Sequence, residues 1–143
     1  NLTTMEYISE VVKGSETALY EAKAILTKLE VFDFDKKINE LSGGTKRKIV
    51  MSAALAKPCD LLILDEPTNH LDPQTQKIIA DTFRDYEGTM LVVSHNVDFV
   101  DNLGVERMLM LPSGEIRYYD KDTVLYYQEL NNQSKYKKNP KNN

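Results

Sequence analysis

Residues 61–72 read LLILDEPTNHLD: four apolar residues, two carboxylates, then a short and mostly polar segment. An apolar run such as 61–64 is typical of a strand that is buried on both faces of a parallel sheet. Asp65 and Glu66 would then stand at the carboxyl end of this strand, where α/β folds place ligand chemistry. Asp72-Pro73 reads as an N-cap and a first-turn proline, so a helix is predicted to begin there.

Two further motifs flank this stretch. LSGG at 41–44 stands immediately before a helical pattern over 45–56, and its backbone amides and the helix dipole predict an anion site. LVVSH at 91–95 is a second apolar strand, and it ends in a histidine. His95 is therefore expected at the same sheet edge as the two carboxylates. Taken singly, the glycines could form only a tight turn, the carboxylates could end a strand in solvent, and the histidine could be a surface residue.

In this order, the three motifs resemble those of ATP-binding-cassette (ABC) ATPases. The resemblance implies an α/β fold: part of the P-loop NTPase (ABC cassette) fold, with a helical subdomain and the C-terminal part of a mainly parallel sheet. Residues 66–72 resemble the ABC-F class, soluble ATPases with two cassettes in one chain that act on ribosomes in translation or antibiotic resistance. Asn69-His70 stands where transporter ATPases usually carry a small pair. The resemblance is good over 36–130 and generic before that.

The resemblance implies roles for residues at the sheet edge, with ATP and Mg²⁺ as ligands. Asp65 would hold Mg²⁺ through water, since Mg²⁺ usually takes one or two carboxylates together with substrate phosphates. Glu66 would be the catalytic carboxylate, which orients and polarises the attacking water. His95 would be the switch histidine, in contact with the γ-phosphate and that water.

A second set of residues is implied to act at a partner cassette. Ser42, Gly43 and Gly44 would bind the γ-phosphate of the partner's ATP, so that two cassettes enclose two ATP molecules. The inter-domain loop would contain Asn69, His70 and Asp72.

Several features depart from the family pattern. Thr45 stands where Gln is usual, Asn96 replaces the Asp that follows the histidine, and Lys121 lies near an expected glycine. Neither the phosphate-binding loop G-x-x-x-x-G-K-[ST] nor a glutamine loop occurs in the 143 residues. Because the sequence also opens on Asn1 rather than Met, we expect a segment of a longer protein that does not turn over ATP alone.

Composition and charge argue against several classes of protein. There are 18 Lys+Arg against 22 Asp+Glu, a net charge of −4, which argues against a surface that binds nucleic acid throughout. A single cysteine, Cys59, excludes an internal disulfide and suits a reducing compartment. No apolar run approaches the length of a membrane span, and no signal peptide is visible. A cytoplasmic location is predicted.

Three segments are predicted. Residues 1–57 form a helical subdomain that ends in the LSGG signature helix. Residues 58–130 form the C-terminal half of the ATPase core, and 131–143 form a flexible Lys/Asn-rich tail. Within them the pattern predicts helices capped by Thr3-Thr4, Ser15, Asp72 and Asn96, a helix over 45–56, strands at 61–64 and 90–93, and a hairpin of 108–111 with 116–119.

The function implied is ATP hydrolysis between two cassettes to act on the ribosome. The partners would then be a second cassette and ribosomal RNA, without membrane insertion or DNA. One alternative is the ATPase subunit of a transporter, against which Asn69-His70 counts. Another is an SMC-like clamp on DNA, against which the lack of coiled-coil heptads counts. The chain by itself could also be a non-enzymatic module that lends Ser42-Gly43-Gly44 to another cassette.

Overall fold

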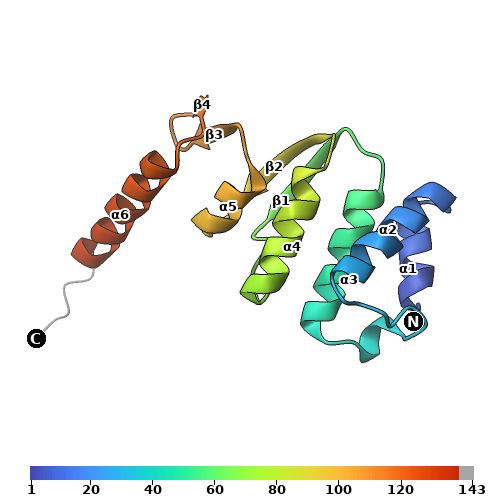
Figure 1. The fold of residues 1–143 in the computed structure, drawn as a ribbon. Coiled ribbons are helices and arrows are strands. Elements are labelled where there is room, and N and C mark those ends of the chain that lie inside the picture. Colours follow the sequence, from blue (N-terminus) through green and yellow to red (C-terminus); the bar gives the residue numbers. More distant parts are fainter. Residues whose placement is uncertain (139–143) are drawn as a thin grey trace, which may run out of the picture. The chain divides into compact units, whose positions relative to one another are not determined.

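The structure, a computed structural model, describes residues 1–138. It has two compact units, Asn1–His95 and Asn96–Asn143. The first unit opens with α1 (Thr4–Val11), α2 (Glu16–Lys28), the 3₁₀ helix η1 (Ile38–Glu40) and α3 (Gly43–Ala56) (Figure 1). Of these, α3 packs against both α1 and α2. Ile8, Leu26 and Ile49 are fully or almost fully buried and form the centre of this helical layer.

Local capping explains where the first two helices begin. The Thr3 hydroxyl accepts a hydrogen bond from the Glu6 backbone N–H, and the Glu6 carboxylate accepts one from the Thr3 N–H, which makes a capping box. The Ser15 hydroxyl accepts from the Ala18 N–H and starts α2. Both starts confirm the predicted caps. Gly14, between the two helices, has φ +70°, which glycine adopts without steric cost.

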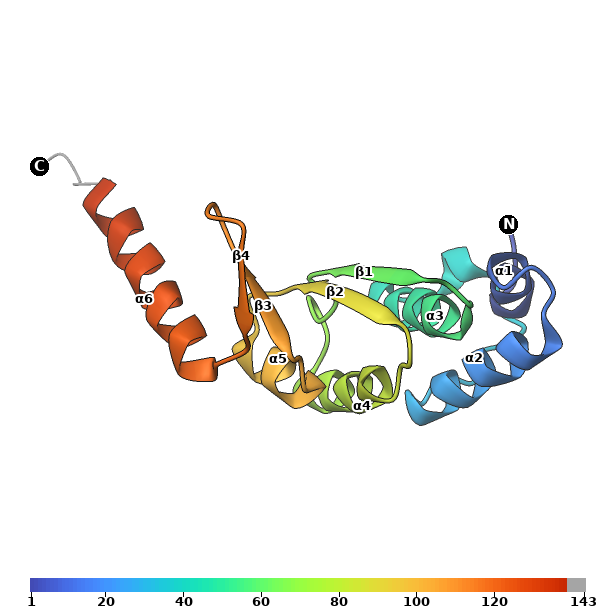
Figure 2. The same cartoon turned by 90° about the horizontal axis from the view of Figure 1, so that it is seen from above.

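The first unit continues with β1 (Leu61–Asp65), α4 (Pro73–Arg84) and β2 (Thr89–Val93). The two strands pair in parallel, with Leu61 opposite Thr89 and Asp65 opposite Val93. Figure 2 shows α4, the helix that connects them, on one side of the pair. The predicted division after residue 57 differs from the observed one, because α3 and both strands belong to the same unit.

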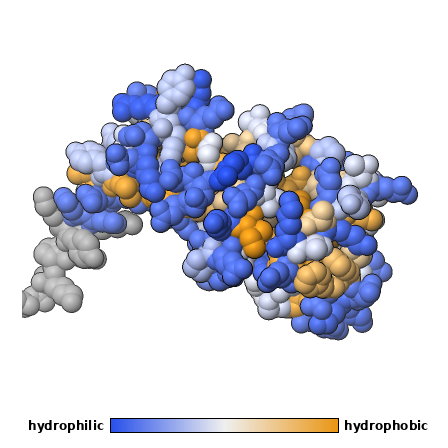
Figure 3. Space-filling view, viewed as in Figure 1, coloured by the Kyte–Doolittle hydropathy of each residue, from blue (hydrophilic) through white to orange (hydrophobic). Residues whose placement is uncertain are grey.

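Burial alternates along β1, which corrects the predicted burial on both faces. Leu62 and Leu64 are buried, whereas the side chains of Leu61 and Ile63 are 51% and 61% exposed. The cause is coverage: within residues 1–95 the described elements α3 and α4 lie on only one side of the pair (Figure 2). The helix side of this unit is largely hydrophilic, with small hydrophobic patches (Figure 3).

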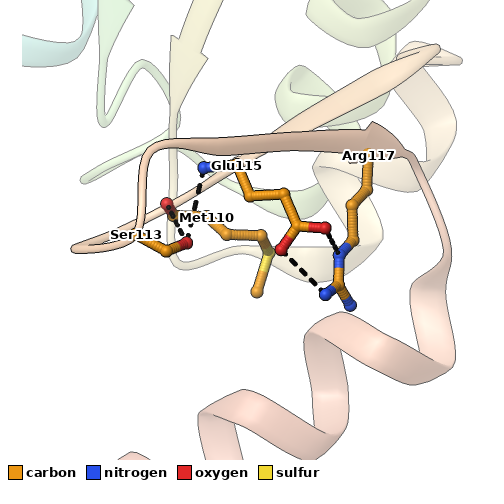
Figure 4. A network of polar contacts seen from close by, with 4 residues as sticks. All are labelled: Met110, Ser113, Glu115 and Arg117. Carbon is orange, nitrogen blue, oxygen red and sulfur yellow. Dashed lines mark hydrogen bonds and ion pairs between the residues drawn. The ribbon is translucent and has the colours of Figure 1, made fainter.

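The second unit contains α5 (Val97–Leu103), β3 (Arg107–Met110), β4 (Glu115–Tyr118) and α6 (Lys121–Lys138). β3 and β4 form the predicted antiparallel hairpin. In its turn the Ser113 hydroxyl donates to the Met110 carbonyl and accepts from the Glu115 N–H, and the Glu115 carboxylate forms a two-point ion pair with Arg117 (Figure 4). Asn96 caps α5 as predicted.

α6 overlaps the segment that was predicted to be a flexible tail. The Asp120 carboxylate accepts from the Thr123 N–H and starts the helix, which then runs past residue 131 to Lys138. The Lys121 ammonium contacts Asp98 and Asp101 and so ties α6 to α5. Residues 139–143 of the predicted tail lie outside the described residues. No helix within residues 1–138 is long and apolar enough to cross a membrane.

Candidate functional site

Glu66 lies immediately after β1, and both its backbone and its side chain are bonded to the end of β2. Its backbone N–H donates to the Val93 carbonyl at 2.8 Å. Its carboxylate Oε1 accepts from the His95 backbone N–H at 3.0 Å. The side chain is only 22% exposed. Glu66 therefore occupies the joint between the two strand ends, as predicted.

The His95 imidazole lies beside the same carboxylate. Its Nε2 is 3.5 Å from Glu66 Oε1, and the ring is 92% exposed. A carboxylate that is held by a backbone N–H and has an exposed imidazole next to it can position a water molecule and accept its proton. The sequence placed these two residues at one edge of the sheet, and the structure brings them into contact.

Asp65 ends β1 on its exposed face, opposite Val93. Its carboxylate thus stands at the carboxyl end of the strand pair, next in sequence to Glu66. Carboxylate oxygen is a ligand that Mg²⁺ accepts, and one such ligand is enough where phosphate oxygens supply others. Among residues 1–138 no three His, Cys, Asp or Glu side chains gather into a metal-binding group.

The Ser-Gly-Gly motif forms the start of α3 rather than a turn before it. The Ser42 hydroxyl accepts from the Thr45 N–H, so Ser42 is the N-cap, and Gly43 and Gly44 form the first helical turn. This corrects the predicted start at residue 45. The unpaired backbone N–H groups of a first turn favour anions. Apart from the adjacent residues and the backbone of α3 itself, nothing lies within 4 Å of where a Cβ would stand on either glycine, so no other element crowds this turn.

The loop between β1 and α4 ends at a helix cap formed by one of the residues predicted to act at the partner cassette. Asp72 caps α4, where its carboxylate accepts from the backbone N–H and the hydroxyl of Thr75. Both hydrogen bonds lower the pKa of Asp72, and the bond from the Thr75 hydroxyl has the larger effect. Asp72 thus has a structural role that the family resemblance does not assign to it. Two other residues of the loop are exposed, Asn69 and His70, and His70 has φ +65°.

Sequence reasoning missed two side chains that bind the backbone of this loop. The Arg47 guanidinium donates to the Asn69 carbonyl at 2.6 Å and to the Glu66 carbonyl at 3.4 Å. The Gln76 amide donates to the Leu71 carbonyl at 2.8 Å. Their partners are main-chain carbonyl oxygens. Every residue has one, so the sequence does not show which of them accepts a hydrogen bond. For Arg47, the run of basic residues at 46–48 is the one feature of the sequence that could have drawn attention to it.

Cys59 and Tyr86 form one more contact that the sequence did not indicate. The Cys59 Sγ lies 3.1 Å from the Tyr86 Oη, which also donates to the Cys59 carbonyl at 3.3 Å. The hydrogen bond with Cys59 raises the pKa of Tyr86. This pair links the segment before β1 to the segment after α4, at the opposite end of the strand from Glu66.

Residues 31–101 match a protein-family model described as "AAA domain, putative AbiEii toxin, Type IV TA system". The matched range contains the Ser-Gly-Gly helix start, the Asp65-Glu66 strand end and His95. The match therefore covers the part of the chain that carries the candidate site.

Similar curated proteins carry the same segment. The "Uncharacterized ABC transporter ATP-binding protein YfmR" of Bacillus subtilis is 41% identical over 98 residues, 68% of this chain and 15% of that protein. "ATP-binding protein Uup" of Escherichia coli is 35% identical over 124 residues, 82% of this chain and 19% of that protein. "Energy-dependent translational throttle protein EttA" of Haemophilus influenzae is 41% identical over 75 residues, 52% of this chain and 14% of that protein. The chain thus spans less than a fifth of each.

Solved structures share the fold. One is the complex of archaeal ribosomal stalk protein aP1 and archaeal ribosome recycling factor aABCE1, with a TM-score of 0.64 and 28% identity over 80% of this chain and 24% of the matched chain. Another is the dimeric bacterial ABC transporter cassette MJ0796, with a TM-score of 0.65 and 24% identity over 82% of this chain and 56% of that one. The architecture of residues 1–138 is therefore part of a P-loop NTPase cassette, as predicted.

Proposed function

The chain belongs to the ABC ATPases, as part of a nucleotide-binding domain of the ABC-F class, and we propose that its protein hydrolyses ATP between two such domains. One observation carries the proposal. The Glu66 carboxylate is fixed at the end of β1 by the His95 backbone N–H and has the His95 imidazole 3.5 Å away. Phosphoryl transfer asks a protein mainly for position and charge, and this pair supplies both.

Each residue at the sheet edge then has one task. Glu66 orients the attacking water and polarises it, because its carboxylate is an acceptor held in one direction. His95 contacts the γ-phosphate and the same water from the end of β2. Asp65, exposed at the strand end, would hold Mg²⁺ through water; the ion would neutralise charge on the phosphate oxygens.

The start of α3 would serve the ATP of a second cassette. Ser42 caps this helix, and Gly43 and Gly44 expose its first-turn N–H groups, which can bind the γ-phosphate oxygens. Asn69 and His70 would belong to the loop that meets the second cassette. The partner is either a second domain of the same protein or a second copy of it.

The residue-level proposal is tested with Glu66→Gln in the whole protein. Glutamine keeps the size of the side chain but loses the charge that polarises water. ATP should still bind, and hydrolysis should slow by roughly 10²- to 10⁴-fold. Glu87→Gln, an exposed residue between α4 and β2, is the matched control and should turn over normally. Wild-type turnover in Glu66→Gln would remove Glu66 from the mechanism.

At the level of the cell, we propose that the protein is cytoplasmic and acts on the ribosome. Two similar proteins support this by name: the translational throttle protein EttA and the archaeal ribosome recycling factor aABCE1. The test is to sediment ribosomes with whole protein that carries Glu66→Gln, with ATP and without it. Co-sedimentation only with ATP is the expected result.

A transporter ATPase subunit is the second candidate, because YfmR is named an ABC transporter ATP-binding protein. The same sedimentation experiment separates the two candidates. A protein that pellets with membranes, and with ribosomes under neither condition, would favour the transporter role. Asn69-His70 in the loop after Glu66 makes the ribosomal role the one we prefer.

A further inference from the structure

Arg47 is the side chain of α3 that reaches the loop behind Glu66. Its guanidinium Nη1 donates to two carbonyls of one turn, those of Asn69 at 2.6 Å and Glu66 at 3.4 Å. The lysines on either side of it bond elsewhere: Lys46 to the Asn39 carbonyl and Lys48 to the Leu29 carbonyl. The contact is therefore specific to position 47, and not a general property of the basic run at 46–48.

The turn that Arg47 binds is one that needs external support. Glu66 has φ +44° and His70 has φ +65°, and residues other than glycine keep such conformations only when their surroundings hold them. On the C-terminal side of the loop, the Gln76 amide donates a hydrogen bond to the Leu71 carbonyl. On the N-terminal side, the Arg47 guanidinium donates to the Glu66 carbonyl. Arginine suits this task because its planar group always carries charge and presents several N–H donors at once.

We infer that Arg47 is a positioning residue for ATP hydrolysis: it fixes the main chain of Glu66 and Asn69, and so holds the Glu66 carboxylate against His95. The inference rests on the proposed function, since it gives Glu66 its hydrolytic role. It also means that the helix that begins with Ser42-Gly43-Gly44 is bonded directly to the catalytic turn of the same domain. Arg47 itself touches neither water nor phosphate in this role.

The test compares variants of the whole protein by ATP binding and by steady-state hydrolysis. Arg47→Met keeps the apolar length and removes every donor, and Arg47→Lys keeps one cationic donor. Lys46→Met is the matched control, because Lys46 lies on the same turn of α3 and bonds outside the loop. We expect Arg47→Met to lower kcat by roughly 10- to 100-fold with KM for ATP unchanged, since small misplacements of a catalytic group cost that much. Arg47→Lys should recover part of the rate, and Lys46→Met should match wild type.

A further variant separates positioning from a general structural effect. In a Glu66→Gln background, adding Arg47→Met should change the rate by less than about twofold, because the group that it positions is already disabled. A wild-type kcat in Arg47→Met, or a raised KM with kcat unchanged, would overturn the inference. If Arg47→Met does not fold, Arg47→Gln takes its place once its melting temperature matches wild type, and a wild-type kcat there has the same meaning.

The proposed function and this inference fail in different ways. If Glu66→Gln hydrolyses ATP at the wild-type rate, the proposed function is wrong. If Glu66→Gln is slow and the Arg47 variants are not, the function stands and the positioning role of Arg47 is wrong.

Discussion

Among single residues, Glu66 shows how an unusual backbone conformation and a candidate function coincide. Its φ of +44° is rare for a residue with a side chain, and both its N–H and its carboxylate bond to the segment Val93–His95. Together with the Arg47 contact to its carbonyl, these bonds engage the N–H, the carboxylate and the carbonyl of the residue. Strained conformations of this kind concentrate at functional sites, where the surrounding structure maintains them.

His95 gives the first residue-scale prediction. In the whole protein, His95→Ala should leave ATP binding in place and slow hydrolysis by roughly 10²-fold or more, because the imidazole next to Glu66 is removed while the backbone N–H that holds the carboxylate remains. Phosphate release at saturating ATP is the measurement. Glu87→Ala, at the exposed residue between α4 and β2, is the comparison, and it should match wild type. Equal rates for His95→Ala and wild type would contradict the role of His95.

Asp72 gives a prediction about pH. Hydrogen bonds from Thr75 lower its pKa in the folded state, so the ionised carboxylate stabilises the fold. This contribution is complete above the ordinary aspartate pKa and disappears as the pH falls through the lowered value. Asp72→Ala should therefore lower the melting temperature by a constant amount from neutral pH to about pH 5, and by progressively less under more acidic conditions. Asp35→Ala, at a residue that caps no helix, is the control; a difference that grows toward acid would contradict the assignment.

At the scale of secondary-structure elements, the positions of the helices were largely predictable because their caps are local. Each cap side chain accepts a hydrogen bond from the backbone N–H three residues ahead, as seen for Thr3, Ser15, Asp72 and Asn96. Such a bond depends only on the type of the cap residue and on its position just before a helical pattern, and both can be read from the sequence. Whether β1 is buried on one face or on both was not predictable. Whether an apolar strand is buried on one side or two depends on which elements cover it, and LLIL reads the same in both cases. Arg47 was missed for a similar reason, since its partners are carbonyls 19 and 22 residues away in sequence.

Substitutions in α2 test how the helical layer of α1, α2 and α3 is packed. Leu26 of α2 is fully buried, whereas Tyr20 on the same helix is 76% exposed. Leu26→Ala should lower the free energy of unfolding by about 2–5 kcal/mol, the usual cost of such a truncation in a packed core. Tyr20→Ala should stay within about 0.5 kcal/mol of wild type. Chemical denaturation of the whole protein followed by circular dichroism measures both, and similar costs for the two variants would mean that this layer is packed differently.

At the scale of the whole molecule, the 143 residues contain some parts of the proposed ATPase site but no phosphate-binding loop. Glu66, His95 and the α3 start are present, but no sequence of the form G-x-x-x-x-G-K-[ST] occurs within the 143 residues. Binding of the phosphates depends on such a loop. The purified 143-residue chain should therefore release no phosphate from ATP in the steady state. Steady release that Glu66→Gln abolishes would show that these residues suffice for turnover.

The open face of the strand pair leads to a prediction about association of the same purified chain. Leu61, Ile63, Leu91 and Val93 are each at least 44% exposed, and the register places them on one side of β1 and β2. Exposed apolar side chains on a sheet with free edges favour pairing between chains. Sedimentation velocity should show association that increases with concentration. Ile63→Lys should reduce it by placing charge at the centre of the face, and Tyr20→Lys on α2 should not. A chain that stays monomeric at every concentration, or one that responds equally to both lysines, would show that this face does not drive self-association.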